Sequence, residues 1–309
     1  MSDVWIDTDP SIGLPGHEAD DGFALVQAFH SPELRIRGLS TTYGNAGLAT
    51  TTRIARDMAR RFGAPAGLME GAVFAGAASP RDLGRATAAT EALRNALAER
   101  PLTYLALAPL TNLATLLTLH PEAAARIERV IFVGGRSPGV RFRAGRWNPY
   151  EFTDGNFHKD HAAAGVLLAA AVPLSLVPVE LALENLLAPG ELARIGREGG
   201  AAGGYLARKA WLWMRLWRLC FGLSGAVVFD CFAVLAATHP HLLEGEDRRV
   251  EVVRVPGGRP GNPRDVHLVA GGAGDGSARE ARFHGRARPG VREVLLERLL
   301  GRGAGGSTA

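Results

Sequence analysis

The chain alternates short apolar runs with segments of helical spacing, and this alternation limits its possible folds more than any other feature. Strand-like runs are predicted at 4–6, 34–39, 102–107, 130–133, 174–179 and 266–270, and helices at 20–29, 50–62, 86–99, 110–119, 161–171 and 291–300. Strands that alternate with helices form a parallel sheet with helices on both faces. We therefore predict a single doubly wound, mainly parallel α/β domain over residues 1–300, with a flexible tail at 301–309.

Four aspartates follow the first predicted strand closely. Asp7 and Asp9 stand at the end of that strand, and Asp20 and Asp21 begin the next predicted helix. Carboxylates that converge at a strand end repel one another unless a cation lies among them, and oxygen ligands without histidine or cysteine favour Ca²⁺ or Mg²⁺ over zinc. The alternative is a helix cap at Asp20 with the other aspartates in solvent. That alternative explains a single aspartate better than it explains the group.

The chain resembles the nucleoside hydrolase family, whose N-terminal signature is Asp-Thr-Asp-Pro-Gly-x-Asp-Asp. Here the signature is split by a longer loop at 11–19. The matching segments, in the family's order, are Asp7-Thr8-Asp9-Pro10, Asp20-Asp21, Tyr43-Gly44-Asn45, Ala108-Pro109-Leu110-Thr111-Asn112-Leu113, Val133-Gly134-Gly135, Asn148, Asp154-Gly155-Asn156 and Phe229-Asp230. Each motif is weak alone, but their order over residues 4–245 makes the set specific.

The resemblance implies Ca²⁺-dependent hydrolysis of the N-glycosidic bond of a ribonucleoside, releasing free base and ribose. The reaction would use a metal-bound water and an oxocarbenium-like transition state, in purine or pyrimidine salvage. The implied metal ligands are Asp9, Asp21, Asp230 and the main-chain carbonyl of Thr111, with Asp9 also the general base. The implied substrate-binding residues are Asp20, Asn45, Asn148, Asp154, Asn156 and Phe229, with Asp7 in support. The family also implies a homo-oligomer, either a dimer or a tetramer.

Several positions depart from the family pattern. Asp154 is shorter than the family's glutamate, and Gly155 replaces an aromatic residue. Phe229 stands where some members carry a histidine that protonates the leaving base, and phenylalanine donates no proton. We therefore predict poor hydrolysis of ordinary purine nucleosides. Another donor would have to come from elsewhere, and the candidates in sequence are His17 and Glu18 of the inserted loop and His158.

Three tryptophans precede Phe229 in a helical stretch, at Trp211, Trp213 and Trp217. Such a stripe is typical of core packing, although one aromatic ring could also stack on the base. Trp213 and Trp217 share one helix face and Trp211 points elsewhere. Both interpretations are compatible with this spacing.

Two other functions are compatible with parts of the sequence. A haloacid-dehalogenase-type phosphatase would use Asp7 as nucleophile and Asp9 as acid/base. It would also need a downstream lysine and a second acidic pair, and the only lysines, Lys159 and Lys209, have no motif context. A non-catalytic nucleoside-binding protein is favoured by the missing histidine but leaves the water-activating aspartates unexplained.

Composition excludes several broad classes. The net charge is only +4 and the basic residues are dispersed, so no nucleic-acid partner is expected. No apolar run reaches the length of a membrane span, and no leader segment is visible. The two cysteines, Cys220 and Cys231, form no disulfide framework or metal motif. We expect a cytoplasmic protein that acts on a small molecule.

Overall fold

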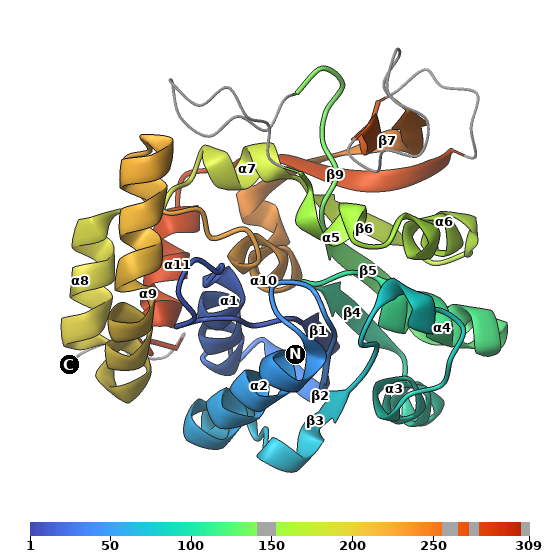
Figure 1. The fold of residues 1–309 in the computed structure, drawn as a ribbon, viewed down its shortest axis with the longest axis horizontal. Helices are drawn as coiled ribbons and strands as arrows, with labels where there is room; N and C mark the ends of the chain where they lie inside the picture. The colour runs from blue at the N-terminus through green and yellow to red at the C-terminus, as the bar shows by residue number, and fades with distance from the viewer. Residues whose placement is uncertain (141–152, 255–264, 272–277, 304–309) are drawn as a thin grey trace.

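The computed structural model describes residues 1–140, 153–254, 265–271 and 278–303. Its centre is a nine-stranded sheet in the order β3-β2-β1-β4-β5-β6-β9-β7-β8 (Figure 1). Neighbouring strands from β3 to β9 run parallel, whereas β7 pairs antiparallel with β9 and β8. The predicted fold class, a mainly parallel α/β sheet, is therefore confirmed.

The elements have the following bounds. The strands are β1 Ser2–Thr8, β2 Leu34–Thr41, β3 Val73–Ala75, β4 Leu102–Ala106, β5 Ile127–Val133, β6 Leu174–Val177, β7 Leu243–Arg254, β8 Val266–Ala270 and β9 Arg279–Ala287. The α-helices are α1 Asp20–Phe29, α2 Leu48–Phe62, α3 Ala88–Glu99, α4 Thr111–Leu119, α5 Gly155–His158, α6 His161–Ala169, α7 Val179–Leu183, α8 Pro189–Glu198, α9 Gly200–Phe221, α10 Cys231–Thr238 and α11 Val291–Leu299. Short 3-10 helices are η1 Ala64–Ala66, η2 Glu70–Ala72, η3 Pro80–Asp82, η4 Pro121–Arg126 and η5 Pro240–Leu242.

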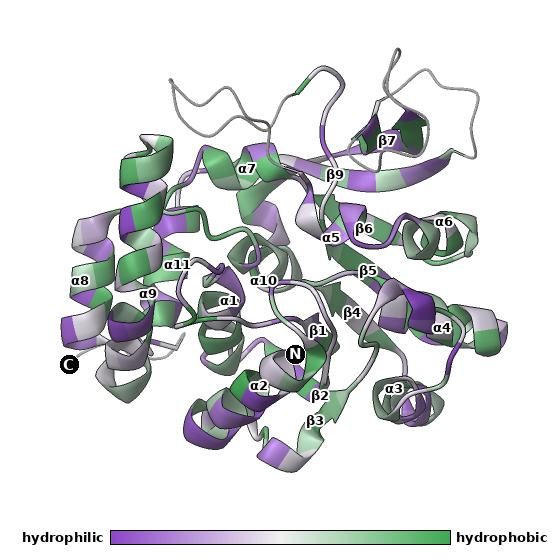
Figure 2. Ribbon diagram, viewed as in Figure 1, coloured by the Kyte–Doolittle hydropathy of each residue, from purple (hydrophilic) through white to green (hydrophobic). Residues whose placement is uncertain are grey.

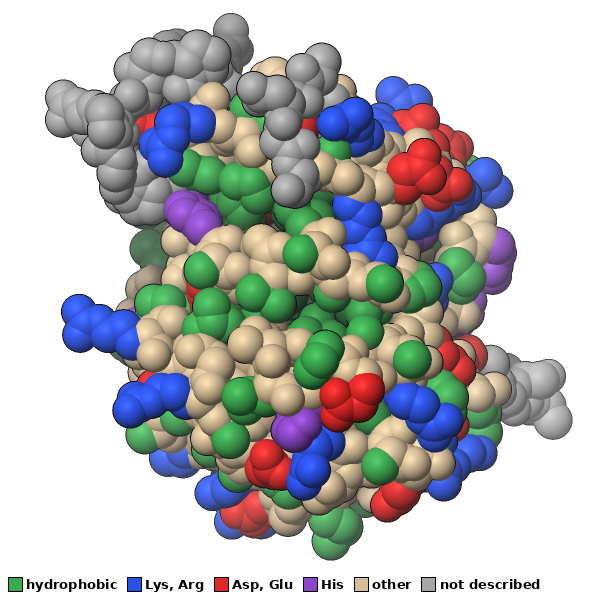
Figure 3. All heavy atoms as spheres, turned by 90° about the vertical axis from the view of Figure 1, so that its right-hand side faces the viewer, with side chains coloured by type: hydrophobic (Ala, Val, Ile, Leu, Met, Phe, Trp, Pro, Cys, Tyr) green, Lys and Arg blue, Asp and Glu red, His purple; other side chains and the backbone are tan. Residues whose placement is uncertain are grey.

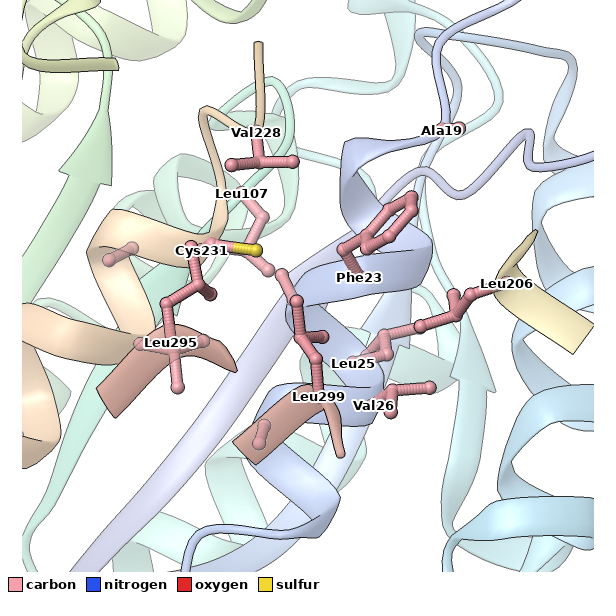
Figure 4. Packing of buried hydrophobic residues seen from close by; sticks show 14 of the residues in the cluster. Ala19, Phe23, Leu25, Val26, Leu107, Leu206, Val228, Cys231, Leu295 and Leu299 are labelled. Carbon is pink, nitrogen blue, oxygen red and sulfur yellow. The ribbon is translucent and has the colours of Figure 1, made fainter. Parts of the chain in front are cut away.

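Helices cover both faces of the parallel part of the sheet. One face carries α1, α2 and α8 to α11, and the other carries α3, α4 and α6 (Figure 1). The central strands are apolar along their length (Figure 2), because a strand covered on both sides has no solvent face. In the first core, Phe23 and Leu25 of α1 lie among side chains of α9, α10 and α11, including Leu206 and Leu299 (Figure 4). Fully burying one such side chain stabilises the fold by about 1.5–3 kcal/mol.

In the antiparallel edge, β8 was predicted from the sequence but β7 and β9 were not. Strand β7 reads Leu-Glu-Gly-Glu-Asp-Arg-Arg-Val-Glu-Val-Val-Arg, and much of its first half is exposed. Strands are predicted from the alternation of apolar and polar residues along the sequence. The charged residues of this partly solvated edge strand interrupt that alternation. β9 carries three arginines and was missed for the same reason. None of the described helices is long and apolar enough to cross a membrane.

Candidate active site

Three carboxylates that are far apart in the sequence converge beyond the carboxyl ends of the strands. Asp20 and Asp21 form the first turn of α1, and Asp230 occupies the N-cap position of α10. One carboxylate oxygen from each of the three lies within 4.8 Å of the other two, and all three side chains are buried. Two helix N-termini thus face the same acidic cluster, which lowers the cost of placing negative charge there.

Burial and mutual repulsion oppose the ionisation of the acidic cluster. Burial raises the pKa of Asp20 well above its usual value, and repulsion from Asp21 is the second cause. Burial and repulsion from Asp20 do the same to the pKa of Asp230. Oδ1 of Asp20 is buried and has no hydrogen-bond partner among the described residues. An oxygen-only, buried and self-repelling set of this kind fits a hard divalent cation.

Asp9 lies next to the acidic cluster and is held by the loop after β2. Its Oδ2 accepts the main-chain N–H of Asn45 at 2.6 Å, and the Asn45 side-chain amide donates to Asp9 Oδ1 at 3.3 Å and to Asp21 Oδ2 at 3.0 Å. A Cβ on Gly44 would lie 1.7 Å from Asp9 Oδ2. Only glycine therefore lets this loop approach the carboxylate closely enough to bind it.

The side chain of Lys159 reaches Asp9, although nothing in the sequence predicted a lysine at this site. Nζ of Lys159 lies 3.8 Å from Asp9 Oδ2 and donates to Asn45 Oδ1 at 3.3 Å. Burial and repulsion from Asp21 raise the pKa of Asp9 well above its usual value, and the ammonium group opposes this rise. A Cβ on Gly155 would lie 3.6 Å from Lys159 Nζ. That distance is ordinary van der Waals contact, so Gly155 is not required for the ammonium to fit, and no local signal in the sequence pointed to Lys159.

Asp7 occupies the supporting position predicted for it. Its Oδ1 accepts hydrogen bonds from Ser40 Oγ at 2.6 Å and from Asn112 Nδ2 at 2.8 Å. Burial raises its pKa to about 6, against the lowering effect of these hydrogen bonds. The side chain lies beneath the loop that carries Asp9 and does not line the cavity described next.

A cavity of about 150 Å³ opens beside the acidic cluster. Its lining is polar near the aspartates and apolar elsewhere. The lining residues are Glu18, Asp20, Asn45, Leu107, Val133, Gly134, Thr153, Asp154, Gly155, Asn156, Val179, Leu183, Trp217, Phe229 and Asp230. Most of the predicted substrate-binding residues therefore share one cavity. Asn148 lies outside the described residues.

Two of the polar residues in the lining differ in what they can offer a ligand. Asn156 Nδ2 donates to the carbonyls of Leu107 at 3.0 Å and Val133 at 3.1 Å, and none of the described residues donates to its amide oxygen. Asp154 already accepts the main-chain N–H of Phe157 at 3.2 Å and that of Gly135 at 2.6 Å. Its shorter side chain thus serves the turn before α5, with less capacity left for a sugar.

Thr111 is not among the described residues that line the cavity. It is the first residue of α4, and its hydroxyl donates to Asp160 Oδ2 at 2.6 Å. Leu107, which follows the end of β4, lines the cavity instead. The binding of the cation by the main-chain carbonyl of Thr111 therefore stays a prediction. The residues that face the site depend on where the hydrogen bonding of the strand stops. The sequence motif alone does not identify that residue.

Of the three candidate proton donors, only Glu18 lines the cavity. His17 is exposed, with Nδ1 2.5 Å from the carbonyl oxygen of Asn45. His158 Nδ1 contacts the carbonyl of Asp154 at 2.7 Å. Glu18 instead accepts the indole N–H of Trp213 at 2.6 Å, and burial raises its pKa.

Both interpretations of the tryptophan stripe apply to the helix α9. Trp213 is buried and stacks on Phe23 with ring centroids 5.7 Å apart. Trp217 lines the cavity, 6.3 Å from the ring of Phe229. Trp211 is 52% exposed, in agreement with its expected position on another face.

The fold and the site together define an α/β protein with a buried carboxylate cluster that fits a divalent cation, beside a cavity of about 150 Å³. The chain belongs to the inosine-uridine preferring nucleoside hydrolase family, whose sequence model matches residues 4–270. This confirms the resemblance found in the motifs. The haloacid-dehalogenase alternative has no support.

Known relatives and solved structures agree with this assignment. The chain is 28% identical over 214 residues to the non-specific ribonucleoside hydrolases RihC of Escherichia coli O9:H4 and Shigella boydii serotype 18, covering 62% of this chain and 66% of theirs. The chain thus spans just under two thirds of the length of these relatives. The fold is similar to that of a plant nucleoside hydrolase, PpNRh1 (TM-score 0.80, 23% identity, 97% of this chain and 99% of that one). It is also similar to a purine-preferring ribonucleoside hydrolase from Gardnerella vaginalis (TM-score 0.77, 19% identity, the same coverage).

Proposed function

We propose that this protein is a Ca²⁺-dependent N-ribohydrolase that cleaves ribonucleosides to free base and ribose. The observation that carries the proposal is the buried cluster of Asp20, Asp21 and Asp230, which opens onto a cavity in a chain of this family. The RihC relatives are non-specific ribonucleoside hydrolases, which supports the same reaction. A homo-oligomeric, cytoplasmic enzyme of nucleoside salvage remains part of the proposal.

The roles of the residues follow from their contacts. Asp9, Asp21 and Asp230 would hold the cation. When bound, a divalent cation lowers the pKa of a water molecule and so prepares it for attack. Asp9 takes the proton of the attacking water, and Asn45 fixes the Asp9 carboxylate through two hydrogen bonds.

The sugar is held at the polar end of the cavity. Oδ1 of Asp20, which has no partner among the described residues, and the amide oxygen of Asn156 are acceptors for ribose hydroxyls. Polar groups fixed in this way favour the oxocarbenium-like transition state without having to reorganise as positive charge develops on the sugar.

The direct test is release of ribose from a panel of nucleosides and modified nucleosides, measured as reducing sugar. We expect turnover of at least one ribonucleoside, with Ca²⁺ required. Binding of nucleosides without any turnover would instead identify a non-catalytic nucleoside-binding protein.

Each chain is expected to bind one Ca²⁺ through Asp9, Asp21 and Asp230. With free Ca²⁺ at a hundred times Kd, the free energy of unfolding should rise by about 2.7 kcal/mol over that of the chelated protein. The measurements are elemental analysis after dialysis against calcium and thermal unfolding with and without EGTA. Asp230→Asn should remove most of the stabilisation. Asp57→Asn is the control, because Asp57 pairs with Arg60 and Arg61 on the surface. Bound zinc, or no metal, would contradict the assignment.

Asp20→Ala is expected to impair ribose recognition more than cation binding. The loss of one hydrogen bond between a charged acceptor and a hydroxyl lowers kcat/KM by about 10- to 100-fold. The comparison of uridine with 2′-deoxyuridine measures this recognition in the wild type and the variant. Equal cleavage of the two substrates by the wild-type enzyme would refute the proposed roles of Asp20, Asn45 and Asn156.

A further inference from the structure

We propose that Glu18, carried by the inserted loop, recognises the nucleobase and selects bases that present an N–H donor. The preferred substrates would then be ribonucleosides whose base carries a ring or exocyclic N–H. The inference rests on the proposed hydrolase function and names its substrate class. The carboxylate of Glu18 is half-buried and lines the cavity. It has no role in the proposed cation binding or in the attack of water.

The carboxylate of Glu18 is held in place by the long helix α9. The indole N–H of Trp213 donates to Oε2 at 2.6 Å, and Trp217 also hydrogen-bonds this carboxylate. An ionised carboxylate has about four acceptor positions, and two indoles fill two of them. Among the described residues no other hydrogen bond to this carboxylate is seen, and Glu18 lines the cavity.

The inserted loop is itself fixed to the protein, so that Glu18 is in place before a ligand arrives. The hydroxyl of Ser11 donates to the carbonyl of Glu18 at 2.7 Å, and the side chain of Ile12 is buried directly against Gly22 of α1. Ser11 is itself fully buried. A contact fixed in advance contributes more to binding because less freedom is lost on association.

The position of Glu18 in the cavity favours the base over the sugar. Apolar residues in the lining include Val179, Leu183, Trp217 and Phe229, and Glu18 touches Trp217. A flat ring suits this apolar end, while the sugar hydroxyls suit the aspartates and Asn156. Phe229 offers no hydrogen bond, whereas Glu18, beside Trp217, offers a polar group to a ring bound at this end.

A carboxylate at this place discriminates between bases. It binds an N–H donor well and repels the lone pair of a ring nitrogen or carbonyl that faces it. Sites that must hydrogen-bond a ligand reject analogues that lack the partner, because a semi-buried polar group is left unmatched. The charges that face Glu18 are those of Asp20, Asp21 and Asp230, which strengthen its negative potential, and Lys159, which weakens it.

The test compares kcat/KM for substrate pairs that differ by one donor: adenosine against purine riboside, and uridine against 3-methyluridine. In Glu18→Met, which keeps the volume and removes the acceptor, the ratio within each pair should fall by about 10- to 100-fold. Glu18→Gln retains one acceptor and should give an intermediate ratio. Because effects on folding or on the cation change both substrates of a pair alike, the ratio reports recognition of the base.

A matched pair of tryptophan variants tests the same contact from the other side. Trp213→Phe removes the indole N–H that holds Glu18 and should lower the ratios in the same direction. Trp211→Phe makes the same change at an exposed position of the same helix and should leave them unchanged. If Glu18→Met and Glu18→Gln cleave these nucleosides with wild-type ratios, the inference is wrong while the hydrolase function stands. If the wild-type protein releases ribose from no nucleoside, the proposed function itself fails and this inference with it.

Discussion

Asp9→Asn is expected to lower kcat/KM for any cleaved ribonucleoside by about 10²–10⁴-fold while the protein stays folded. The amide that replaces the carboxylate cannot take the proton of water, and it gives a weaker oxygen ligand. It would still accept the main-chain N–H of Asn45, so that the loop after β2 keeps its place. Initial rates of ribose release at saturating Ca²⁺ measure the loss of kcat/KM. Circular dichroism with thermal unfolding shows whether the variant stays folded.

Two controls separate loss of the base from loss of the cation. Asp57→Asn makes the same change on the surface of α2 and should keep wild-type activity. Calcium titration of Asp9→Asn shows whether the cation is still bound under the assay conditions. If the variant retains more than about a tenth of wild-type activity with Ca²⁺ bound, Asp9 is not the general base.

The second large effect concerns the leaving group. We expect the wild-type enzyme to prefer p-nitrophenyl riboside over inosine by about 10²–10⁴-fold in kcat/KM, the usual contribution of general-acid help. A nitrophenolate leaves without a proton, whereas a purine anion leaves poorly unless one is supplied. Phe229 lines the cavity where the family's histidine would stand, and its ring has no proton to give.

Restoring a donor should reduce this preference. Phe229→His is expected to raise kcat/KM for inosine relative to p-nitrophenyl riboside. Phe221→His is the matched control, since Phe221 contacts Trp217 but is not among the cavity-lining residues described above. Near-equal rates on the two substrates in the wild type would show that another residue already protonates the base.

The expectation that the protein has no nucleic-acid partner stays a prediction. On the face shown in Figure 3, lysine and arginine side chains are dispersed among acidic ones. A nucleic-acid footprint would instead gather basic residues on one face.

Local pattern was sufficient to predict most of the fold. The predicted helix at 20–29 coincides with α1, and the predicted strand at 266–270 coincides with β8. Periodicity is a property of neighbouring residues, so it can be read without knowing what the segment packs against. The order of the motifs also placed Asp9, Asp20, Asp21 and Asp230 at strand ends and helix starts. Parallel sheets bring such positions together at one edge.

The sequence by itself therefore determined the fold class, the family and the acidic core of the site. The tertiary structure alone decided which groups surround that core. Lys159 meets Asp9, Trp213 meets Glu18 across 195 positions of the chain, and Leu107 rather than Thr111 lines the cavity. These contacts join residues with no local pattern in common. They depend on where a loop turns, where a strand ends and whether a glycine leaves room for a neighbouring side chain, and only the packed chain specifies them.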